Sequence, residues 1–334
     1  MSPQDLRDRP QSAGDPLSEV LRLVEVSGAI SGGFAIGGAW TSSYRLTMPL
    51  KFAAVVRGGV WMQADGVAPV RVDAGDIVVL NHRRELTMTS TREGAFPVEF
   101  QHSEANTFVT VDDHAERDVV LGGHIDVNDV GRQLLSTALP PLLHVRASAP
   151  DASHLHGLID QVYDEVIADR IGADFAITQL AQLLVLSILR TYLKDTESLP
   201  PSWLALLSDS RLRPAVAAMH ADPGNRWCLA DLARTAAMSR TSFAERFRAL
   251  AGVPPLTYLG TLRMLLAQRA LRDPDVRVGV LAAQLGYTSD SAFSNAFKRE
   301  VGMSPLRYRA GLGQDGCHSS SSAAATSSGM STLV

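Results

Sequence analysis

The chain has only two cysteines among its 334 residues. Cys228 and Cys317 lie far apart, so they form neither the disulfide framework of a small secreted domain nor a zinc site. Long hydrophobic runs are also missing, because no stretch of eighteen apolar residues occurs, and the sequence predicts no membrane-spanning helix. The N-terminal segment MSPQDLRDRPQSAGDP lacks the apolar centre of a secretory signal. These absences predict a protein of the reducing cytoplasm.

Charge of one sign is not in large excess over the whole chain, whose net charge is −4. The two signs are nevertheless separated along the sequence. Residues 1–202 carry 16 Lys and Arg against 26 Asp and Glu, a balance of −10, and residues 203–310 carry 15 against 8, a balance of +7. Asp315 supplies the remaining −1. This separation indicates that only the C-terminal part binds a polyanion.

The region from Phe34 to about Thr110 predicts short strands. The segments FAIGGAW, KFAAVVRG, VWMQA, VRV and DIVVL are rich in β-branched or aromatic residues, and VVLGGHI (119–125) adds another. Gly58-Gly59, Asp65-Gly66 and the segment 74–76 are natural turns between them. Several short strands at this spacing favour a β-barrel or a β-sandwich.

The hydrophobic period then changes to that of helices. Residues 154–168 place their apolar side chains on one helix face. The following helix, residues 175–193, is so apolar that it must be buried, either in its own domain or against another chain. Homodimerisation and packing beneath the strands are therefore the two alternatives for this segment.

The basic part repeats itself. At an offset of 49, Leu232, Ala233 and Ala237 match Leu281, Ala282 and Gly286. At an offset of 50, Ser239, Phe243, Phe247, Gly252, Pro255, Leu256 and Tyr258 match Ser289, Phe293, Phe297, Gly302, Pro305, Leu306 and Tyr308. So many matches in register within a short segment indicate two copies of one structural unit.

Each copy has the parts of a helix-turn-helix. Ser239 and Ser289 are suited to cap the second helix, and its two phenylalanines face the core. Between the copies, Leu256–Arg272 predicts one helix that holds the two recognition helices about one DNA turn, roughly 34 Å, apart. The side chains that point outward are Arg240, Thr241, Ala244, Glu245 and Arg248 in the first copy and Asp290, Ser291, Ser294, Asn295 and Lys298 in the second.

Trp227–Arg309 resembles the DNA-binding domain of the AraC/XylS-type regulators. The most specific motifs are G-Y-x-S, F-x-x-x-F-K-R and G-M-S-P-x-x-Y-R in the second copy. The resemblance implies a seven-helix domain that contacts DNA through the ten outward residues named above. Ala244 and Glu245 depart from the family, whose members often carry longer polar or basic side chains there.

The N-terminal half resembles the cupin-type sensor domain that precedes this DNA-binding domain in many members. The segments DPLSEVLRLVEVSGAI and VRVDAGDIVVLNHRRELTM carry this resemblance. Members often have a cysteine before the glycine of a C-G-H-like strand, but Gly122 stands there in this chain. We therefore expect no oxidant sensing through that position.

Some cupins are metal enzymes, which need several histidines and a carboxylate in the barrel. The hairpin GGVWMQADGVAPVRV contains no histidine, and the next hairpin offers only His82. A single imidazole does not hold a catalytic metal, so we expect no metal, no cofactor and no enzymatic activity.

A small-molecule pocket is the alternative to an enzyme site. The side chains that could line it in the barrel interior are Trp40, Phe52, Trp61, His82 and His124. The competing explanations are that these aromatic side chains fill the core, and that the domain serves only as a dimerisation scaffold.

The sequence thus predicts a two-domain α+β protein, with a cupin-like β-barrel followed by helices and an all-α double helix-turn-helix. The expected segments are a flexible lead-in (1–15), the sensor domain (16–150), a helical dimerisation or packing segment (151–195), a linker (196–202), the DNA-binding domain (203–310, with helix-turn-helix units at 229–250 and 278–301) and a disordered tail (311–334). The expected function is sequence-specific transcription regulation under small-molecule control. The expected partners are double-stranded operator DNA, a second copy of the chain, an effector and RNA polymerase, without a membrane.

Overall fold

The protein is described by a computed structural model. It covers residues 16–24, 30–91, 96–97, 107–111, 117–125, 127–149, 152–168, 170–195 and 199–318. The chain forms two compact units, one of Val24–Ser208 and one of Asp209–Val334 together with Met1–Leu23. The predicted lead-in (1–15) lies outside the described residues.

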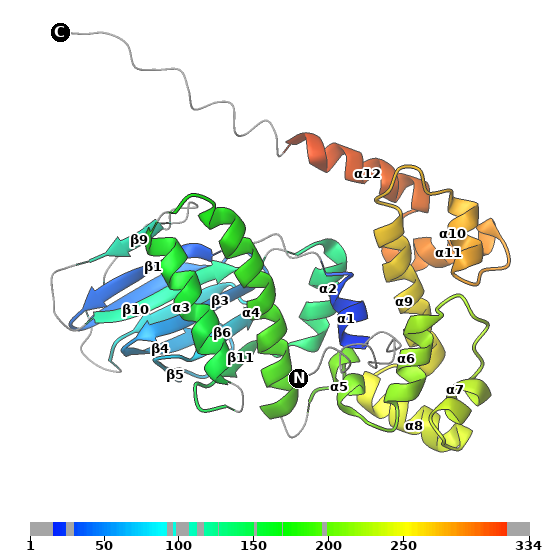
Figure 1. Ribbon diagram of the computed structural model, residues 1–334, viewed down its shortest axis with the longest axis horizontal. Helices are drawn as coiled ribbons and strands as arrows, with labels where there is room; N and C mark the ends of the chain where they lie inside the picture. The colour runs from blue at the N-terminus through cyan, green and yellow to red at the C-terminus, as the bar shows by residue number, and fades with distance from the viewer. Residues whose placement is uncertain are drawn as a thin grey trace, which may run out of the picture. The chain divides into compact units, whose positions relative to one another are not determined.

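The N-terminal unit contains two antiparallel-rich sheets (Figure 1). The first has the order β11-β6-β3-β10-β1-β9 and is built from β1 (Ile30–Gly37), β3 (Leu50–Arg57), β6 (Ile77–Asn81), β9 (Thr107–Thr110), β10 (Arg117–His124) and β11 (Leu142–Val145). The second has the order β5-β4-β7-β2-β8 and is built from β2 (Trp40–Arg45), β4 (Gly59–Ala64), β5 (Val70–Asp73), β7 (Glu85–Thr89) and β8 (Phe96–Pro97).

One hydrophobic core lies between the two sheets. In β4, Val60 and Met62 are fully buried and Trp61 between them is only half-buried, because successive side chains of a strand point to opposite faces. Residues from strands of both sheets join the same cluster, including Ile36, Val55 and Leu86. The predicted strand-rich domain is therefore confirmed. The segment FAIGGAW, however, is divided between β1 and β2, because Gly38 between them has a φ of 72°.

Helices cover the outer face of the six-stranded sheet. All five residues of β6 are buried, which requires cover on both faces. Figure 1 shows α3 (Ala152–Ala168) and α4 (Ala173–Asp195) lying across this sheet. Among the described residues, α4 is the one helix long and apolar enough to cross a membrane, although half of its apolar window is buried in the fold. The sequence analysis predicted no membrane-spanning helix, because no run of eighteen apolar residues occurs. In α4, polar residues such as Gln179 and Gln182 interrupt the apolar sequence.

The boundary between the units lies later than predicted. The sequence placed residues 203–208 in the DNA-binding domain, but α5 (Trp203–Ser208) belongs to the N-terminal unit. The Trp203 indole Nε1 donates a hydrogen bond to the Leu134 carbonyl of α2 (Asp129–Ala138), at 2.9 Å. A tryptophan buried with its N–H paired in one unit keeps its helix there.

The C-terminal unit is helical. Its helices are α1 (Pro16–Leu21), α6 (Arg213–Ala221), α7 (Leu229–Thr235), α8 (Arg240–Ala251), α9 (Pro255–Ala270), α10 (Val278–Gln284), α11 (Asp290–Val301) and α12 (Pro305–His318). The predicted tail beginning at residue 311 is wrong for 311–318, which continue α12. α1, which the sequence analysis assigned to the sensor domain, packs on α6.

Candidate nucleic-acid interface

The repeat in the sequence is a repeat in three dimensions. Phe243 and Phe247 have ring centroids 5.7 Å apart at 53°, and Phe293 and Phe297 have centroids 5.8 Å apart at 50°. In each copy the second phenylalanine meets a tyrosine edge-on, Tyr258 or Tyr308, at 5.6 Å and 70°. All four phenylalanines are fully buried. The same aromatic contacts therefore hold α8 and α11 in their respective cores.

The predicted caps of the recognition helices are confirmed. The Ser239 Oγ accepts a hydrogen bond from the Ser242 N–H at 3.2 Å, and the Ser289 Oγ accepts one from the Ala292 N–H at 3.1 Å. Both helices end at a glycine in the left-handed region, Gly252 with φ 76° and Gly302 with φ 86°. The two helices thus begin and end at equivalent positions of the repeat.

The tight turns are also equivalent, although their residues differ. Gly286 has φ 79° in the second copy, and Ala237 takes its place in the first with φ 51°. The next residue in each turn, Met238 or Tyr287, donates its N–H to a carbonyl of the preceding helix at 2.9 Å. The first turn therefore holds an alanine in a conformation that glycine adopts more readily.

The ten predicted DNA-contact residues lie on the two second helices and point away from the cores. Eight are exposed, and Ala244 and Ser294 are half-buried. A Cβ added to Gly279, near the start of α10, would lie 2.8 Å from a carboxylate oxygen of Asp290. Asp290 is therefore placed against the preceding helix, whereas Asn295 and Lys298 lie further along α11.

Arg246 lies among the predicted contacts in sequence and is exposed, but its guanidinium is paired with Asp209 of the same unit. Its Nε donates to the Asp209 carboxylate at 2.8 Å. The other Asp209 oxygen accepts from the N–H groups of Arg211 and Leu212, at 3.0 and 2.9 Å. Burial raises the pKa of Asp209, but the hydrogen bonds from Arg246, Leu212 and Arg211 outweigh it and hold the pKa below the ordinary 3.8. Sequence reasoning missed this pair because Asp209 is 37 residues away.

The structure does not bring the five predicted ligand-lining residues together. Trp40 is fully buried in the core between the sheets, with its Nε1 donating to Asp118 at 2.9 Å. Phe52 is buried too, but in β3 it alternates with Ala53, which joins that core. Trp61 alternates with core residues of β4, and His124 ends β10. His82 lies in an exposed loop.

His82 borders a cleft of about 670 Å³ between two loops of the N-terminal unit. Its lining consists of Arg45, Leu46, Thr47, Met48, Pro49, His82, Arg83, Arg84 and Glu85. His82 has φ 51°, and its N–H donates to the Pro49 carbonyl at 2.7 Å, which joins the two loops. The cleft therefore presents three arginines and a histidine against one carboxylate.

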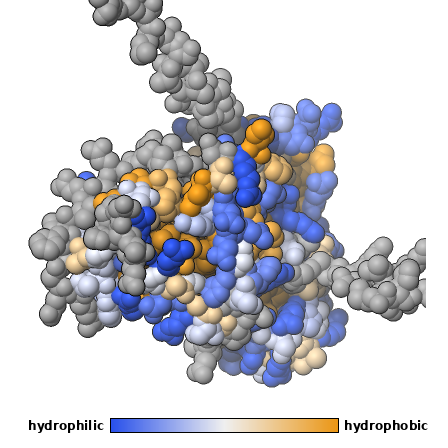
Figure 2. Space-filling model, turned by 60° about the vertical axis from the view of Figure 1, so that its left-hand side comes forward, coloured by the Kyte–Doolittle hydropathy of each residue, from blue (hydrophilic) through white to orange (hydrophobic). Residues whose placement is uncertain are grey.

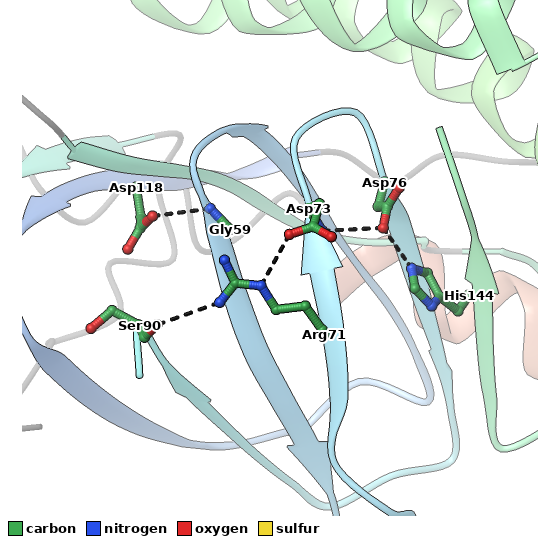
Figure 3. Close-up of polar contacts among 7 residues, drawn as sticks. All are labelled: Gly59, Arg71, Asp73, Asp76, Ser90, Asp118 and His144. Atoms are coloured by element: carbon green, nitrogen blue, oxygen red, sulfur yellow. Dashed lines mark hydrogen bonds and ion pairs between the residues drawn. The ribbon is translucent and has the colours of Figure 1, made fainter. Parts of the chain in front are cut away.

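A buried polar network joins strand ends in the same unit (Figure 3). Asp76 is 6% exposed, and its carboxylate contacts the His144 Nε2 at 2.8 Å and accepts from the Ala147 N–H at 2.7 Å. It also accepts from the Asp73 N–H at 3.1 Å. Across the described part of the chain, no three His, Cys, Asp or Glu residues gather closely enough to hold a metal ion. The hydrogen bonds of Asp76 tie the turn between β5 and β6 to β11 and to the segment after it.

Comparison with known proteins agrees with this architecture. Residues 15–194 match the family described as Cupin, and residues 232–311 match the family described as Helix-turn-helix domain. An AraC-like transcription regulator of Streptomyces lividans is 33% identical over 298 residues, which are 88% of this chain and 98% of that protein. The RCS-specific HTH-type transcriptional activator RclR of Escherichia coli (strain K12) is 28% identical, over 88% of this chain and 97% of its own.

Among solved structures, the DNA-binding domain of AdpA in complex with a target DNA is 38% identical to the matched part. It covers 31% of this chain and 93% of its own, with a TM-score of 0.30. Two observations support the family assignment. The chain contains two helix-turn-helix repeats with buried aromatic cores and outward-facing second helices, and it is similar to a relative over almost the whole length of that protein. The chain belongs to the AraC-like transcription regulators, DNA-binding proteins, and its helix-turn-helix domain follows a cupin domain.

Proposed function

We propose that the chain reads a two-part operator by placing α8 and α11 in successive major grooves on one face of the DNA. The observation that carries this proposal is the equivalence of the two units, whose cores, caps and turns repeat along one chain. A recognition helix that enters the groove presents its outward residues to base edges and phosphates. The two sets, Arg240 to Arg248 and Asp290 to Lys298, are then the reading surfaces.

Selection of bound sequences from a randomised DNA pool with the full chain tests this proposal. We expect a motif of two half-sites about 10 base pairs apart. Lys298→Ala should weaken the contribution of one half-site only, and Glu245→Ala should weaken the other. Arg57→Ala, which removes an exposed arginine at the end of β3 in the N-terminal unit, is the matched control and should change neither. A motif with one half-site would contradict the proposal.

We propose that the chain is a homodimer through the α3–α4 hairpin. Four large apolar side chains there are exposed to solvent: Ile167 (50%), Ile171 (108%), Phe175 (73%) and Leu183 (48%). In Figure 2, apolar residues lie among polar ones on the face turned toward the reader. Apolar side chains clustered on one hairpin favour association with a second copy, because burying them removes them from water.

Sedimentation of the full chain tests the dimer. Phe175→Asp combined with Leu183→Asp should give monomers at concentrations at which the unchanged chain is dimeric. Leu306→Asp is the matched control, because Leu306 is 66% exposed but lies in the C-terminal unit. A monomeric unchanged chain would overturn this part of the proposal.

We propose that an organic anion bound in the His82 cleft controls DNA binding. The support is the excess of cationic groups in the cleft. Arg83 is fixed there by donating to the Asp65 and Asn81 carbonyls, while Arg45 and Arg84 are exposed. A planar guanidinium binds a carboxylate through two hydrogen bonds, so aliphatic and aromatic carboxylates are the expected effectors.

Thermal-shift measurements with carboxylates and with the corresponding uncharged amides test the effector. Carboxylates should stabilise the unchanged chain, and the Arg45→Ala, Arg84→Ala double variant should lose the effect while Arg57→Ala retains it. A response that is equal for acids and amides would contradict an anion site. No response to any compound would favour the alternative of a domain that serves only as a scaffold.

We also place the chain in the cytoplasm, with RNA polymerase as a further partner and without enzymatic activity. The support is its membership among regulators, which must reach chromosomal DNA. Transcription from a selected operator by purified polymerase, with and without the protein, tests the partnership.

A further inference from the structure

The loop that precedes the first helix-turn-helix, residues 222–228, also contacts the linker helix α9. Arg263 of α9 donates from Nε to the Pro223 carbonyl at 2.7 Å and from Nη2 to the Asn225 carbonyl at 2.8 Å. The guanidinium carbon lies 5.8 Å from the centre of the Tyr287 ring, beside the turn of the second helix-turn-helix. One side chain therefore joins the loop, the linker helix and the second repeat.

The same loop also meets the second turn backbone to backbone. A Cβ added to Gly224 would lie 2.1 Å from the Gln284 carbonyl oxygen, and one added to Gly286 would lie 2.2 Å from the Gly224 carbonyl oxygen. No side chain has room between these two segments. The contact is therefore as close as the backbone permits, and it joins the two halves of the DNA-binding unit outside α9.

The linker helix also has single polar contacts with α6 and α11. The Tyr258 hydroxyl and the His220 Nε2 of α6 are 2.8 Å apart. The Thr261 hydroxyl donates to Glu300 of α11 at 3.0 Å. Each of these contacts joins α9 to one other helix, whereas Arg263 and the Gly224–Gly286 contact hold the same loop against both α9 and the second turn. We call Arg263 with Gly224 and Gly286 the brace.

We propose that the brace fixes the distance and rotation between α8 and α11, and so determines which half-site spacing the protein accepts. This rests on the proposed function, in which both helices read DNA. One base pair of spacer rotates a half-site by about 34° around the DNA axis, since a turn contains about 10.5 base pairs. A braced unit cannot follow that rotation with both helices, whereas a unit held by α9 alone can adjust. Arg263 is in this account a positioning residue.

Affinity of the full chain for operators whose spacer is shortened or lengthened by one base pair tests the brace. The affinity of the unchanged chain should fall about 100-fold, because the second half-site no longer adds its binding to that of the first. For Arg263→Ala and Arg263→Lys, the same change in spacer length should lower the affinity less than about tenfold. Their affinity for a single half-site should equal that of the unchanged chain. Lysine keeps the charge but cannot donate to both carbonyls in the same geometry.

Gly224→Ala tests the brace without altering charge, because its methyl group forces the loop away from the second turn. It should relax spacing in the same way as Arg263→Ala. Gly260→Ala is the matched control: it lies in α9 with open space around its Cβ position and should keep the strict spacing.

Thermal unfolding of each variant establishes that the unit is folded. If Arg263→Lys and Gly224→Ala are folded and remain as strict in spacing as the unchanged chain, the brace is overturned. If the unchanged chain binds equally at every spacing or needs only one half-site, the proposed two-part operator is wrong. This result is distinct from a failure of the brace alone.

Discussion

Replacing Ala237 with glycine should stabilise the C-terminal unit. Ala237 has φ 51°, and a residue with a Cβ pays about 1–2 kcal/mol in the left-handed region. Its side chain is exposed, so the substitution removes no packing. Glycine also gives the unfolded chain more conformational freedom than alanine does, which lowers the gain in stability by about 0.4–1 kcal/mol. The expected net gain is about 0.8 kcal/mol, the difference between the midpoints of these two ranges, or roughly 2–3 °C in the melting temperature of a unit of this size.

The equivalent position of the other repeat supplies the opposite change. Gly286→Ala places a methyl group at φ 79° and 2.2 Å from the Gly224 carbonyl oxygen. It should therefore destabilise the unit by more than about 1 kcal/mol. Calorimetry or denaturant unfolding of both variants gives the two values. An Ala237→Gly variant that melts at or below the unchanged chain would refute the strain argument.

Three further predictions concern the network, the ion pair and the reading helices. Asp76→Ala leaves His144 and the Ala147 N–H without their buried partner and should destabilise the N-terminal unit by roughly 2–4 kcal/mol, measured by urea unfolding. The lowered pKa of Asp209 stabilises the fold above the unfolded value of 3.8, and this contribution is lost as the pH falls through the lower folded value. The free energy of unfolding should therefore fall less between pH 7 and pH 3 in Asp209→Asn than in the unchanged chain. Asn295→Ala should relax base preference at one position by about 1–3 kcal/mol, whereas Arg248→Ala should weaken all sequences alike and flatten the salt dependence; a randomised operator at two salt concentrations distinguishes them.

The helices of the two repeats were predictable almost to their residue boundaries. Their local signals are strong: Ser239 and Ser289 cap helices, Gly252 and Gly302 end them, and each signal occurs twice. The prediction erred where packing decides. Trp203 was assigned to the basic part of the sequence, but its indole pairs with Leu134, 69 residues away. The end of α12 was missed because the segment after Ala310 is rich in glycine, which disfavours helix on its own.

The N-terminal unit was predictable as strands but not as a site. The alternation of apolar and polar residues predicts a strand such as β4, but it does not show which face of the strand lies against the core. Trp40 and Trp61 were both predicted to line the pocket, whereas Trp40 is fully buried and Trp61 is half-buried. The short strand β7 was not among the predicted strands, although it pairs with both β2 and β4. The pairing of Asp76 with His144 joins residues 68 apart and left no pattern in the sequence. Long-range contacts of this kind follow from topology rather than from local propensity.

The measurement that tests the central claim most directly is a chemical footprint of the full chain on its selected operator. Protection of guanine N7 from methylation reports contacts in the major groove. Reading by both α8 and α11 predicts two protected tracts about 10 base pairs apart on one face of the DNA. Glu245→Ala should weaken one tract and Lys298→Ala the other. A single tract, or two tracts that respond alike to both substitutions, would contradict the account.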